Sequence, residues 1–351
     1  MRICILGATG LVGRESITLI RRAWPKAEII GFASKRKQLE HGGETFDVLA
    51  APELEEDNAP RGDLALVALD DHHSRRYVPR LLELGYKVVD KSNTYRMETD
   101  VPLVSAGVNC GVVTEQTQLV ANPNCTTIPF TMAMAPLAHA FGLASVAISS
   151  YQAISGAGIG ALDGFLEDSR SGYAEANRVG TQLDPTKYVG NTVPHNGKTD
   201  ESGFSSEERK LMNESRKILD AATLKVSAQC CRVPVAIGHF MNVWLELERA
   251  APLSELEAAL QQTRAAPFLS VNTGPVGEGL TALACVHDRD RTLAGRLRLD
   301  PRDDSGKTVC LTVAGDNLRL GAATNAIRVA SRWFPSQDPE LQAPGNLPVA
   351  R

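Results

Sequence analysis

Short apolar runs alternate with segments of helical periodicity in the first third of the chain. This alternation is typical of βαβ units, in which consecutive strands lie parallel in one sheet. It predicts an α/β domain with a parallel, doubly wound sheet. The predicted strands are residues 3–6, 29–32, 64–69 and 88–89, and the predicted helices are residues 12–24 and 78–84.

The second half of the chain follows a different pattern, in which apolar and polar residues alternate one by one. Such alternation is typical of antiparallel strands that expose one face. Before these strands, residues 205–219 start with Ser205 and Glu208 at capping-box spacing, which predicts a helix. The second domain is therefore predicted to be α+β. The alternating segments are residues 243–247, 293–299 and 309–313.

Residues 116–162 contain no acidic side chain, lysine or arginine. The stretch is longer than the roughly 20 residues of a membrane span, but Pro123, Pro129, Pro136 and Gly142 interrupt it. We interpret it as a buried turn, helix, strand and turn in an active site or a subunit interface. Residues 168–204 lack periodicity, which predicts a long loop or a subunit-contact arm.

Composition excludes several classes of protein. A length of 351 residues is typical of two domains, and the net charge is only -4. Because no long run of lysine and arginine is present, we expect no nucleic-acid partner. The seven cysteines show no CxxC spacing, and the chain opens on a strand-like segment instead of a signal peptide. We therefore expect a reduced, cytoplasmic protein without a membrane anchor.

A glycine-rich loop follows the first predicted strand and precedes the first predicted helix. Residues 7–13 read GATGLVG. Glycines there permit a tight turn and let backbone N–H groups approach a pyrophosphate at the helix N-terminus. The sequence thus predicts a dinucleotide site, although a simple tight turn would use similar residues. The predicted contacts are Gly7, Thr9, Gly10, Leu11 and Val12.

The residues after the second strand predict which dinucleotide binds. NAD sites place an acidic residue here to bind the ribose 2′-OH, whereas a cation accommodates a 2′-phosphate. This chain has Ser34 followed by Lys35, Arg36 and Lys37. We therefore expect NADP, with Ser34 and Arg36 as contacts. The alternative is that the three cations form a solvated loop.

Cys125 lies in a polar turn, NPNCTT, between an apolar strand and a predicted helix whose first turn contains Pro129. The positive end of a helix stabilises a thiolate, which is the nucleophilic form of cysteine. Most isolated cysteines are small buried apolar residues, but the polar turn favours a reactive role for Cys125.

Four motifs together resemble the aspartate-β-semialdehyde dehydrogenase family. Its members carry a GATGxVG loop, an NPNC[ST]T turn, a YQAxSGAG segment and an RVPVxxGH segment. All four occur here in the same order, at residues 7–13, 122–127, 151–158 and 232–239. The resemblance implies a Rossmann-type dinucleotide-binding domain, residues 1–123 with 317–351. It also implies a catalytic and dimerisation domain with a mixed, largely antiparallel sheet, residues 124–316.

The resemblance implies reversible, NADP-dependent reduction of L-aspartyl-4-phosphate to L-aspartate 4-semialdehyde with release of phosphate, a step toward lysine, threonine and methionine. Its members are commonly homodimers. Cys125 matches the nucleophile that carries a thioacyl intermediate, His239 the acid/base catalyst and Gln152 an orienting amide. No metal is expected.

The family's remaining site positions also match residues of this chain. The substrate carries a phosphate, a carboxylate and an ammonium group, so its site needs cations and one acid. Near the nicotinamide, the resemblance implies Ser155, Gly156 and Asn317. A C-terminal helix over residues 317–333 is then expected to pack on the dinucleotide-binding domain. The implied substrate contacts are Arg96 and Lys210 for phosphate, Arg232 for carboxylate, Glu207 for the amino group, and Asn124 beside the nucleophile.

Some segments depart from the family pattern. Residues 92–96 read SNTYR where many members have SSAFR, residues 106–109 read AGVN for PEVN, and a DDHH sequence at 70–73 replaces a glycine-rich turn. We expect a surface loop near the adenine end at 70–73. An acyl-phosphate or acyl-thioester reductase with another substrate, such as N-acetyl-γ-glutamyl-phosphate reductase, remains an alternative. So does a non-catalytic NADP-binding or redox-sensing paralogue.

Overall fold

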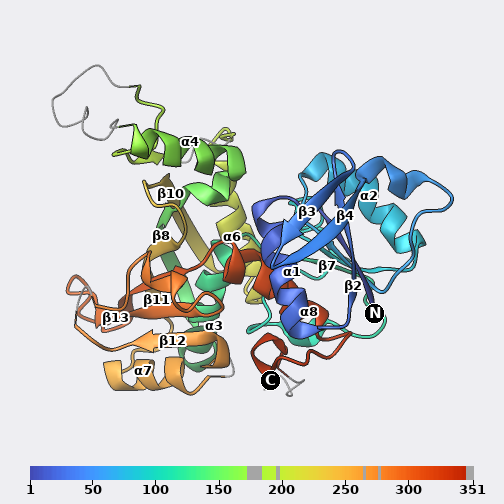
Figure 1. Ribbon diagram of the computed structural model, residues 1–351. Coiled ribbons are helices and arrows are strands. Elements are labelled where there is room, and N and C mark those ends of the chain that lie inside the picture. The colour runs from blue at the N-terminus through green and yellow to red at the C-terminus, as the bar shows by residue number, and fades with distance from the viewer. Residues whose placement is uncertain (172–183, 195–197, 264–265, 276–277, 345–351) are drawn as a thin grey trace. The chain divides into compact units, whose positions relative to one another are not determined.

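The computed structural model describes residues 1–171, 184–194, 198–263, 266–275 and 278–344 (Figure 1). The chain forms two compact units. The first contains Met1–Asn124 and Ala322–Arg351, and the second contains Cys125–Gly321. The chain therefore leaves the first unit once and returns to it near its C-terminus. The expected division had these two crossings at residues 123/124 and 316/317.

Seven described strands form the sheet of the first unit, in the order β3-β4-β2-β1-β5-β6-β7. The neighbouring strands are parallel, except that β3 and β4 form an antiparallel hairpin at one edge. The predicted parallel, doubly wound sheet is confirmed. The strands are β1 Arg2–Leu6, β2 Glu28–Ala33, β3 Lys37–His41, β4 Glu44–Ala50, β5 Leu64–Val67, β6 Lys87–Asp90 and β7 Leu119–Ala121.

Helices cover both faces of this sheet, because successive side chains of a strand point to opposite faces. Ile3 and Ile5 of β1 belong to one apolar core with residues of α1 and α8, whereas Cys4 and Leu6 belong to another with residues of α2. The helices are α1 Leu11–Ala23, α2 Asp71–Glu83 and α8 Asn325–Ala330, with short 3₁₀ turns at Ala51–Glu55, Cys110–Val112 and Pro339–Leu341.

The second unit has a mixed sheet with the described order β12-β13-β14-β11-β8-β10-β9. Two neighbouring pairs, β12 with β13 and β8 with β10, are parallel, and the others are antiparallel. This confirms the predicted largely antiparallel sheet. The strands are β8 Leu143–Gln152, β9 Val193–Pro194, β10 Lys225–Arg232, β11 His239–Leu247, β12 Leu269–Asn272, β13 Thr292–Leu299 and β14 Thr308–Gly315.

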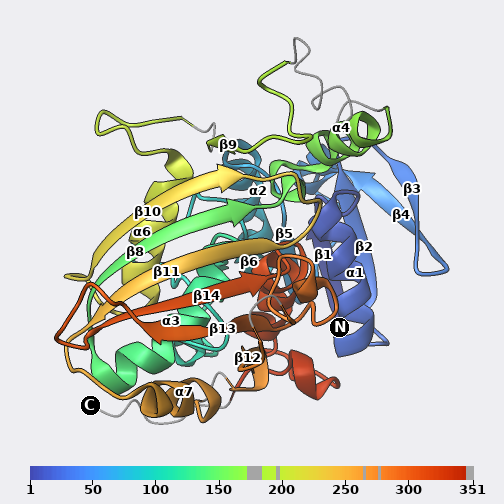
Figure 2. The ribbon, with the colours of Figure 1, turned by 90° about the vertical axis from the view of Figure 1, so that its left-hand side faces the viewer.

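Helices α3, α6 and α7 pack on one face of the second sheet, and Figure 2 shows α3 and α6 behind the central strands. Helix α3 is buried along most of its length, so this part of the uncharged stretch lies in the interior of the unit. Among the described residues, no helix is long and apolar enough to cross a membrane. The helices are α3 Thr127–Phe141, α4 Ile159–Arg170, α6 Ser206–Ile218 and α7 Leu253–Gln261, and 3₁₀ turns are Ile154–Ala157, Ala266–Phe268 and Ala284–Val286.

Three local expectations were wrong or incomplete. The hairpin β3–β4 was not predicted, because its strands are largely exposed and carry charged residues. Residues 70–73 are not a surface loop but the start of α2, where the Asp70 carboxylate accepts a hydrogen bond from the His73 N–H and caps the helix. The expected helix at 317–333 is a π-helical turn, Arg319–Thr324, followed by the short α8.

The predicted arm at 168–204 is described only in part. Helix α4 occupies its beginning, through Arg170, and β9 lies further along. Residues 172–183 and 195–197 lie outside the described residues.

Candidate active site

Three strands of the second unit bring polar side chains to one edge of its sheet. β8 and β10 are parallel and end at Gln152 and Arg232, which are register partners. β11 runs antiparallel to β8 and begins at His239, and its next residue, Phe240, pairs with Tyr151. The ends of these strands therefore place Gln152, Arg232 and His239 side by side.

Cys125 joins this group from the start of α3. The helix begins at Thr127 with Thr126 as its N-cap, so Cys125 immediately precedes the helix N-terminus, as the sequence predicted. Its Sγ lies 3.2 Å from His239 Nε2. A sulfur between an imidazole and the positive end of a helix is in surroundings that stabilise a thiolate.

His239 is fully buried, and a backbone hydrogen bond to Nδ1 holds its ring. The backbone N–H of Ala153 donates a hydrogen bond to Nδ1 at 3.1 Å. A neutral imidazole that accepts at Nδ1 carries its proton on Nε2, and Nε2 is the nitrogen that faces Cys125. The backbone therefore selects the tautomer that presents a proton to the sulfur.

Gln152 is fully buried beside the cysteine turn. Its amide nitrogen donates to Thr126 Oγ1 at 3.0 Å and to Glu207 Oε1 at 3.3 Å. Its Oε1 atom is buried and has no hydrogen-bond partner within the described part of the chain. Because buried acceptors normally receive a hydrogen bond, this oxygen can accept one from a bound substrate.

Arg232 is buried, with 6% of its surface exposed. Its Nη1 donates to the carbonyl oxygen of Ala153 at 2.9 Å. The Ala153 residue therefore contacts two functional side chains, His239 through its N–H and Arg232 through its carbonyl. A Cβ on Gly156 would lie 2.6 Å from Arg232 Nη1 and 3.3 Å from His239 Cε1, so a side chain there would displace this pair.

Glu207 and Lys210 lie in the first turns of α6. The predicted capping box of Ser205 and Glu208 is present and fixes the start of this helix. Glu207 is 5% exposed, and its carboxylate lies 3.3 Å from Lys210 Nζ. Gln152 also binds Glu207. The start of α6 therefore presents a buried carboxylate next to a cation.

Asn317 holds two loops of the second unit together. Its Oδ1 accepts from the Gly238 N–H at 3.0 Å, and its Nδ2 donates to Ser155 Oγ at 2.9 Å. Gly238 precedes His239, so Asn317 fixes the backbone that carries the imidazole. These hydrogen bonds give Asn317 and Ser155 a structural part in the second unit.

The predicted dinucleotide loop lies in the first unit, between β1 and α1. Gly7 has a φ of +81°, and a Cβ on it would lie 2.5 Å from Ala68 O, so the turn requires glycine. Gly10 differs, because a Cβ there would meet only Gly7 O, at 3.4 Å. Gly10 is also the N-cap of α1, and the described residues supply no side-chain cap. The loop therefore leaves the helix N-terminus open, which fits a bound pyrophosphate.

Arg36 is exposed but is already paired. Its Nε donates to Glu53 Oε1 at 2.8 Å, and its Nη2 donates to Glu53 Oε2. The Ala50 N–H also donates to Glu53, at 2.7 Å. The Ala50 N–H and then Arg36 lower the pKa of the Glu53 carboxyl. A 2′-phosphate bound to Arg36 would therefore lie close to an ionised carboxylate, while Ser34 and Lys35 are exposed nearby.

Arg96 and Asn124 belong to the first unit and are buried. Arg96 Nη2 donates to the carbonyl oxygen of Lys91 at 2.6 Å, which holds its guanidinium near the end of β6. Asn124 is the residue before Cys125.

Four residues that shape the site were not predicted from the sequence. Thr126 binds the Gln152 amide, and Glu53 binds Arg36. Gly321 packs on the nucleophile, because a Cβ there would lie 2.9 Å from Cys125 Cβ. Gly238 has a φ of +104°, and a Cβ would lie 2.1 Å from Ala282 O. Thr126 and Gly238 lie inside the recognised motifs, but no sequence signal marked Glu53 or Gly321.

The other cysteines have free thiols in environments unlike that of Cys125. Cys230 and Cys231 lie in β10. Burial raises the pKa of Cys230 to about 12 and that of Cys285 to about 12. Burial also raises the pKa of Cys4 and Cys231. These thiols therefore stay protonated near neutral pH.

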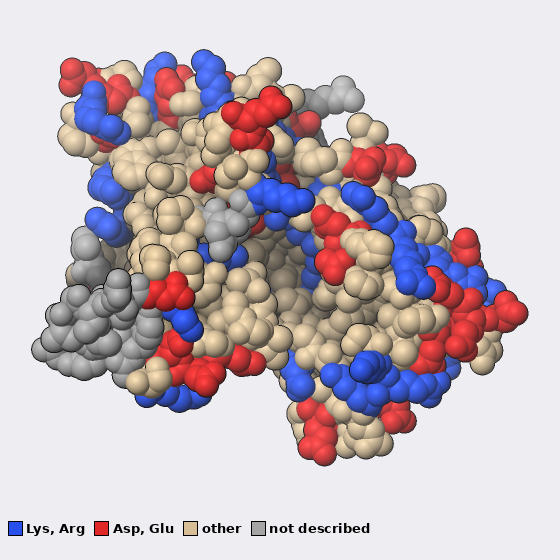
Figure 3. Space-filling model, turned by 90° about the horizontal axis from the view of Figure 1, so that it is seen from above, with Lys and Arg blue, Asp and Glu red and all other residues tan. Residues whose placement is uncertain are grey.

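The described residues contain no cluster of three or more histidine, cysteine or acidic side chains that could hold a metal ion. His73 Nδ1 instead lies 2.9 Å from Asp70 Oδ2 at the start of α2. On the face shown in Figure 3, basic and acidic side chains are interspersed.

Comparisons with known proteins agree with this arrangement. A family model described as semialdehyde dehydrogenase, NAD binding domain, matches residues 2–116, and one described as semialdehyde dehydrogenase, dimerisation domain, matches residues 134–320. The chain is similar to aspartate-semialdehyde dehydrogenase of Aquifex aeolicus, with 33% identity over 94% of this chain and 96% of the relative. It is 36% identical to that of Mycolicibacterium smegmatis, over 94% and 98%.

A solved structure shares the fold over nearly the same length. It is aspartate semialdehyde dehydrogenase II from Vibrio cholerae complexed with ASA, which has 28% identity, a TM-score of 0.84 and coverage of 94% of this chain and 97% of that chain. Together the two family models cover most of both units, and each of these relatives matches the chain across both. The chain therefore belongs to the aspartate-semialdehyde dehydrogenase family.

Proposed function

We propose that this enzyme catalyses the reversible, NADP-dependent reduction of L-aspartyl-4-phosphate to L-aspartate 4-semialdehyde through a thioester on Cys125. The observation that supports it most strongly is the Cys125–His239 pair, with 3.2 Å between Sγ and Nε2 at the start of α3. A hydride does not reduce a carboxylate usefully, whereas a thioester accepts it.

The reductive direction begins when the Cys125 thiolate attacks the acyl carbon. The C–S bond forms, the C–O bond to phosphate breaks, and inorganic phosphate leaves with the bonding electrons. When bound, the nicotinamide supplies the hydride that reduces the thioester carbon. The resulting hemithioacetal breaks its C–S bond, and the aldehyde and the thiolate are released.

His239 places a proton donor at the reacting centre. Its Nε2–H faces the sulfur, so the imidazole can stabilise the thiolate before attack and donate to the oxyanion of each tetrahedral intermediate. The Ala153 N–H keeps Nδ1 as an acceptor and the proton on Nε2. Gln152, whose amide is held by Thr126 and Glu207, orients the acyl group.

Buried charges support the choice of an amino-acid substrate. Arg232 offers a guanidinium for the α-carboxylate, and Glu207 offers a buried carboxylate for the free ammonium. A substrate with an acetylated amine has no charge for Glu207 to balance. Lys210 and Arg96 are the cations proposed to bind the phosphate.

The cationic segment after β2 supports NADP over NAD. Arg36 is the proposed contact of the 2′-phosphate, with Ser34 beside it, and the open N-terminus of α1 is the proposed pyrophosphate site. Glu53 would then reduce the positive charge available to the 2′-phosphate. The remaining proposed cofactor contacts are Thr9, Leu11, Val12, Ser155, Gly156 and Asn317.

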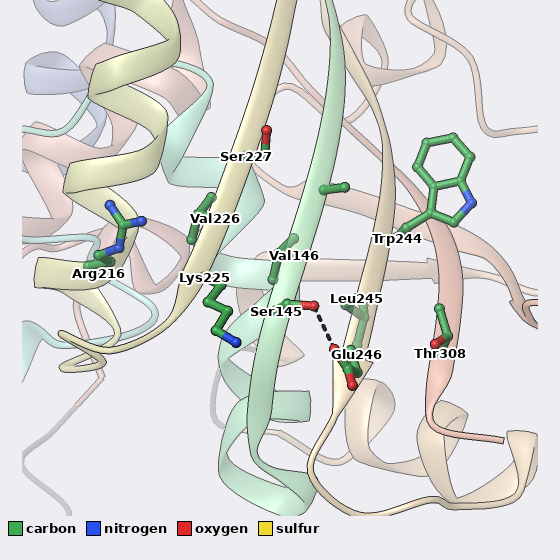
Figure 4. A pocket seen from close by; sticks show the side chains of 11 residues that line it. Ser145, Val146, Arg216, Lys225, Val226, Ser227, Trp244, Leu245, Glu246 and Thr308 are labelled. Carbon is green, nitrogen blue, oxygen red and sulfur yellow. Dashed lines mark hydrogen bonds between the residues drawn. The ribbon is translucent and has the colours of Figure 1, made fainter. Parts of the chain in front are cut away.

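We also propose that the enzyme works as a cytoplasmic homodimer through the face of the second sheet opposite α3, α6 and α7. Figure 4 shows this face around Trp244, with Ser227 on β10 and a Ser145–Glu246 hydrogen bond at 2.8 Å, whereas Val146 and Val226 belong to the apolar core under α3 and α6. A pocket lined by strands β8, β10, β11 and β14 lies there. Wild-type protein should elute at about twice 37.7 kDa, whereas Trp244→Glu should elute as a monomer and an exposed Lys26→Glu control should not.

The activity is tested by following NADPH absorbance when purified protein receives L-aspartate 4-semialdehyde, NADP and phosphate. We expect NADPH formation that requires phosphate and disappears in Cys125→Ala. Replacement of NADP by NAD measures cofactor preference in the same assay. Turnover that continues in Cys125→Ala, or that needs no phosphate, would contradict the proposal.

A further inference from the structure

Lys91 lies at the ligand-binding edge of the first sheet, although no sequence motif marked it. It follows β6, and its N–H donates to Val67 O at the end of β5, at 3.0 Å. On the other side, the Asn122 N–H donates to Asp90 O at 2.7 Å. Lys91 therefore stands between the carboxyl ends of β5 and β7. Ligands of parallel α/β sheets bind at such an edge.

The Lys91 amine is buried and unsatisfied. Part of the residue is exposed, but the Nζ atom is buried and has no hydrogen-bond partner among the residues that the structure describes. Burial lowers the pKa of this amine to about 7. A buried polar group without a partner is destabilising, and in a native protein it commonly marks a functional group.

The neighbouring acid does not satisfy this amine. The Asp90 carboxylate accepts hydrogen bonds from the hydroxyl of Ser74 and from that of Ser92, the latter at 2.6 Å. Its negative charge still acts on Lys91 through space and raises the amine's pKa, against the larger effect of burial. The amine thus has a nearby negative charge but no hydrogen-bond acceptor among the described residues.

Lys87, in strand β6, shows how a lysine with a structural role is held in this unit. Lys87, at the opposite end of β6, donates through Nζ to Thr117 O at 3.0 Å and to Glu115 O. Two carbonyl groups therefore satisfy Lys87. The contrast indicates that the acceptor of Lys91 is a group that binds to the protein.

We propose that Lys91 Nζ binds a phosphate group at the carboxyl edge of the first sheet. This proposal rests on the proposed function, in which phosphate is released or consumed. Lysine binds phosphate as a compact point charge. Arg96, the proposed phosphate residue, donates to the Lys91 carbonyl at 2.6 Å, so both cations belong to one loop. Lys91 would thus add a second cation from this loop to the phosphate site, beside Arg96.

The phosphate could belong to the substrate or to the dinucleotide. Lys91 follows β6, whereas the glycine loop follows β1, and β5 lies between these strands. Strands are spaced by about 5 Å, so the two loops start about 10 Å apart in the sheet. Asn122, by contrast, is at the end of adjacent β7 and precedes Cys125 by three residues. This placement favours the phosphate that leaves the acyl group.

The test compares wild type with Lys91→Met and with Lys87→Met as the matched control. Calorimetry measures the Kd of inorganic phosphate and, separately, of NADP. We expect Lys91→Met to weaken phosphate binding by about tenfold or more, while Lys87→Met leaves it unchanged. Weakened NADP binding alone would support the same chemistry and assign the phosphate to the cofactor. Both Kd values within twofold of wild type would overturn the proposal.

Two further measurements separate binding from folding. Without phosphate, Lys91→Met should unfold at the wild-type temperature or higher, because it loses no hydrogen bond from the described residues. In wild-type protein, inorganic phosphate or NADP should slow acetylation of Lys91, mapped by mass spectrometry, but not that of Lys87. Unchanged acetylation of Lys91 with both ligands would overturn the proposal even if the variant does not fold.

The binding test and the activity test can fail separately. Kd and acetylation need no turnover, so an inactive enzyme in which phosphate protects Lys91 would refute the proposed reaction alone. An active enzyme whose Lys91 ignores phosphate and NADP would refute this inference alone.

Discussion

The two units differ in how their functional side chains are held. In the second unit, protein groups already position the reactive residues: Ala153 binds both His239 and Arg232, and Thr126 binds Gln152. In the first unit, Arg36 is bound by an acidic side chain, and the Lys91 amine lacks a partner among the described residues.

This difference separates two functions of one enzyme. The groups proposed to make and break bonds are ordered before any ligand arrives, which lowers the cost of reorganisation during the reaction. Two cations proposed to bind phosphates in the first unit are not held in this way. Lys91 Nζ has no hydrogen-bond partner among the described residues, and Arg36 is paired with Glu53. Substitutions of the bond-making groups in the second unit should therefore affect kcat most. Substitutions of its substrate-binding groups should affect KM, and those in the first unit should affect binding and stability.

His239→Asn should have the largest effect of these substitutions. The shorter amide can still accept from the Ala153 N–H but places no proton beside Cys125. We expect kcat to fall by about 10²–10⁴-fold with little change in thermal stability. A variant that keeps more than a tenth of the wild-type kcat would show that His239 is not the acid/base group.

Arg232→Lys should have the next largest effect. Lysine keeps the charge but cannot bind a carboxylate through two N–H groups while also donating to Ala153 O. We expect the KM for the semialdehyde to rise by about 10–100-fold, with a smaller change in kcat. An unchanged KM would remove Arg232 from the carboxylate site.

Lys91 should make stability depend on pH. Its pKa is about 7 in the folded chain, against an ordinary value of 10.5. Between these pH values the unfolded chain holds a proton that the folded chain lacks, so the free energy of unfolding rises with pH. Urea unfolding gives the free energy of unfolding of wild type and of Lys91→Met. From pH 7 to pH 10 this free energy should rise more for wild type than for Lys91→Met. A constant difference would contradict the burial of this amine.

Glu53→Gln should have the smallest effect. Glutamine can still accept from the Ala50 N–H but no longer neutralises Arg36. Because the Arg36 side chain is 70% exposed, we expect the preference for NADP over NAD to rise by only about two- to fivefold. Arg36→Ala should lower that preference. If neither variant changes the ratio of kcat/KM values, Arg36 does not contact the 2′-phosphate.

Sequence patterns predicted elements whose side chains are either fully buried or regularly alternating. The strands around Ile5 and Leu66 and the helix after the glycine loop were found because a packed interior requires continuous apolar runs or a 3.6-residue period. The capping box at Ser205 was found because its two hydrogen bonds depend only on local residues. The hairpin β3–β4 was missed although Phe46 and Val48 alternate with exposed residues and Gly42 and Gly43 form its turn, because these signals cover only a few residues.

The site was predictable where chemistry is carried by motifs and was not where it depends on long-range packing. Cys125 and His239 are 114 residues apart, and their pairing was expected only by resemblance. Gly321, against the Cys125 backbone, and Glu53, beside Arg36, have no local signal, because their roles arise from contacts that only the folded chain makes. Lys91 was missed because it is distinguished only by a buried Nζ atom without a hydrogen-bond partner among the described residues, and no sequence pattern reports this.

The most direct test of the central claim is a single-turnover experiment without phosphate. Enzyme is mixed with L-aspartate 4-semialdehyde and NADP, and NADPH and the mass of the Cys125 peptide are measured together. We expect a burst of about one NADPH per active site and an acyl group on Cys125 that is lost when phosphate is added. Full turnover without phosphate, or a burst without acylated Cys125, would contradict the thioester mechanism.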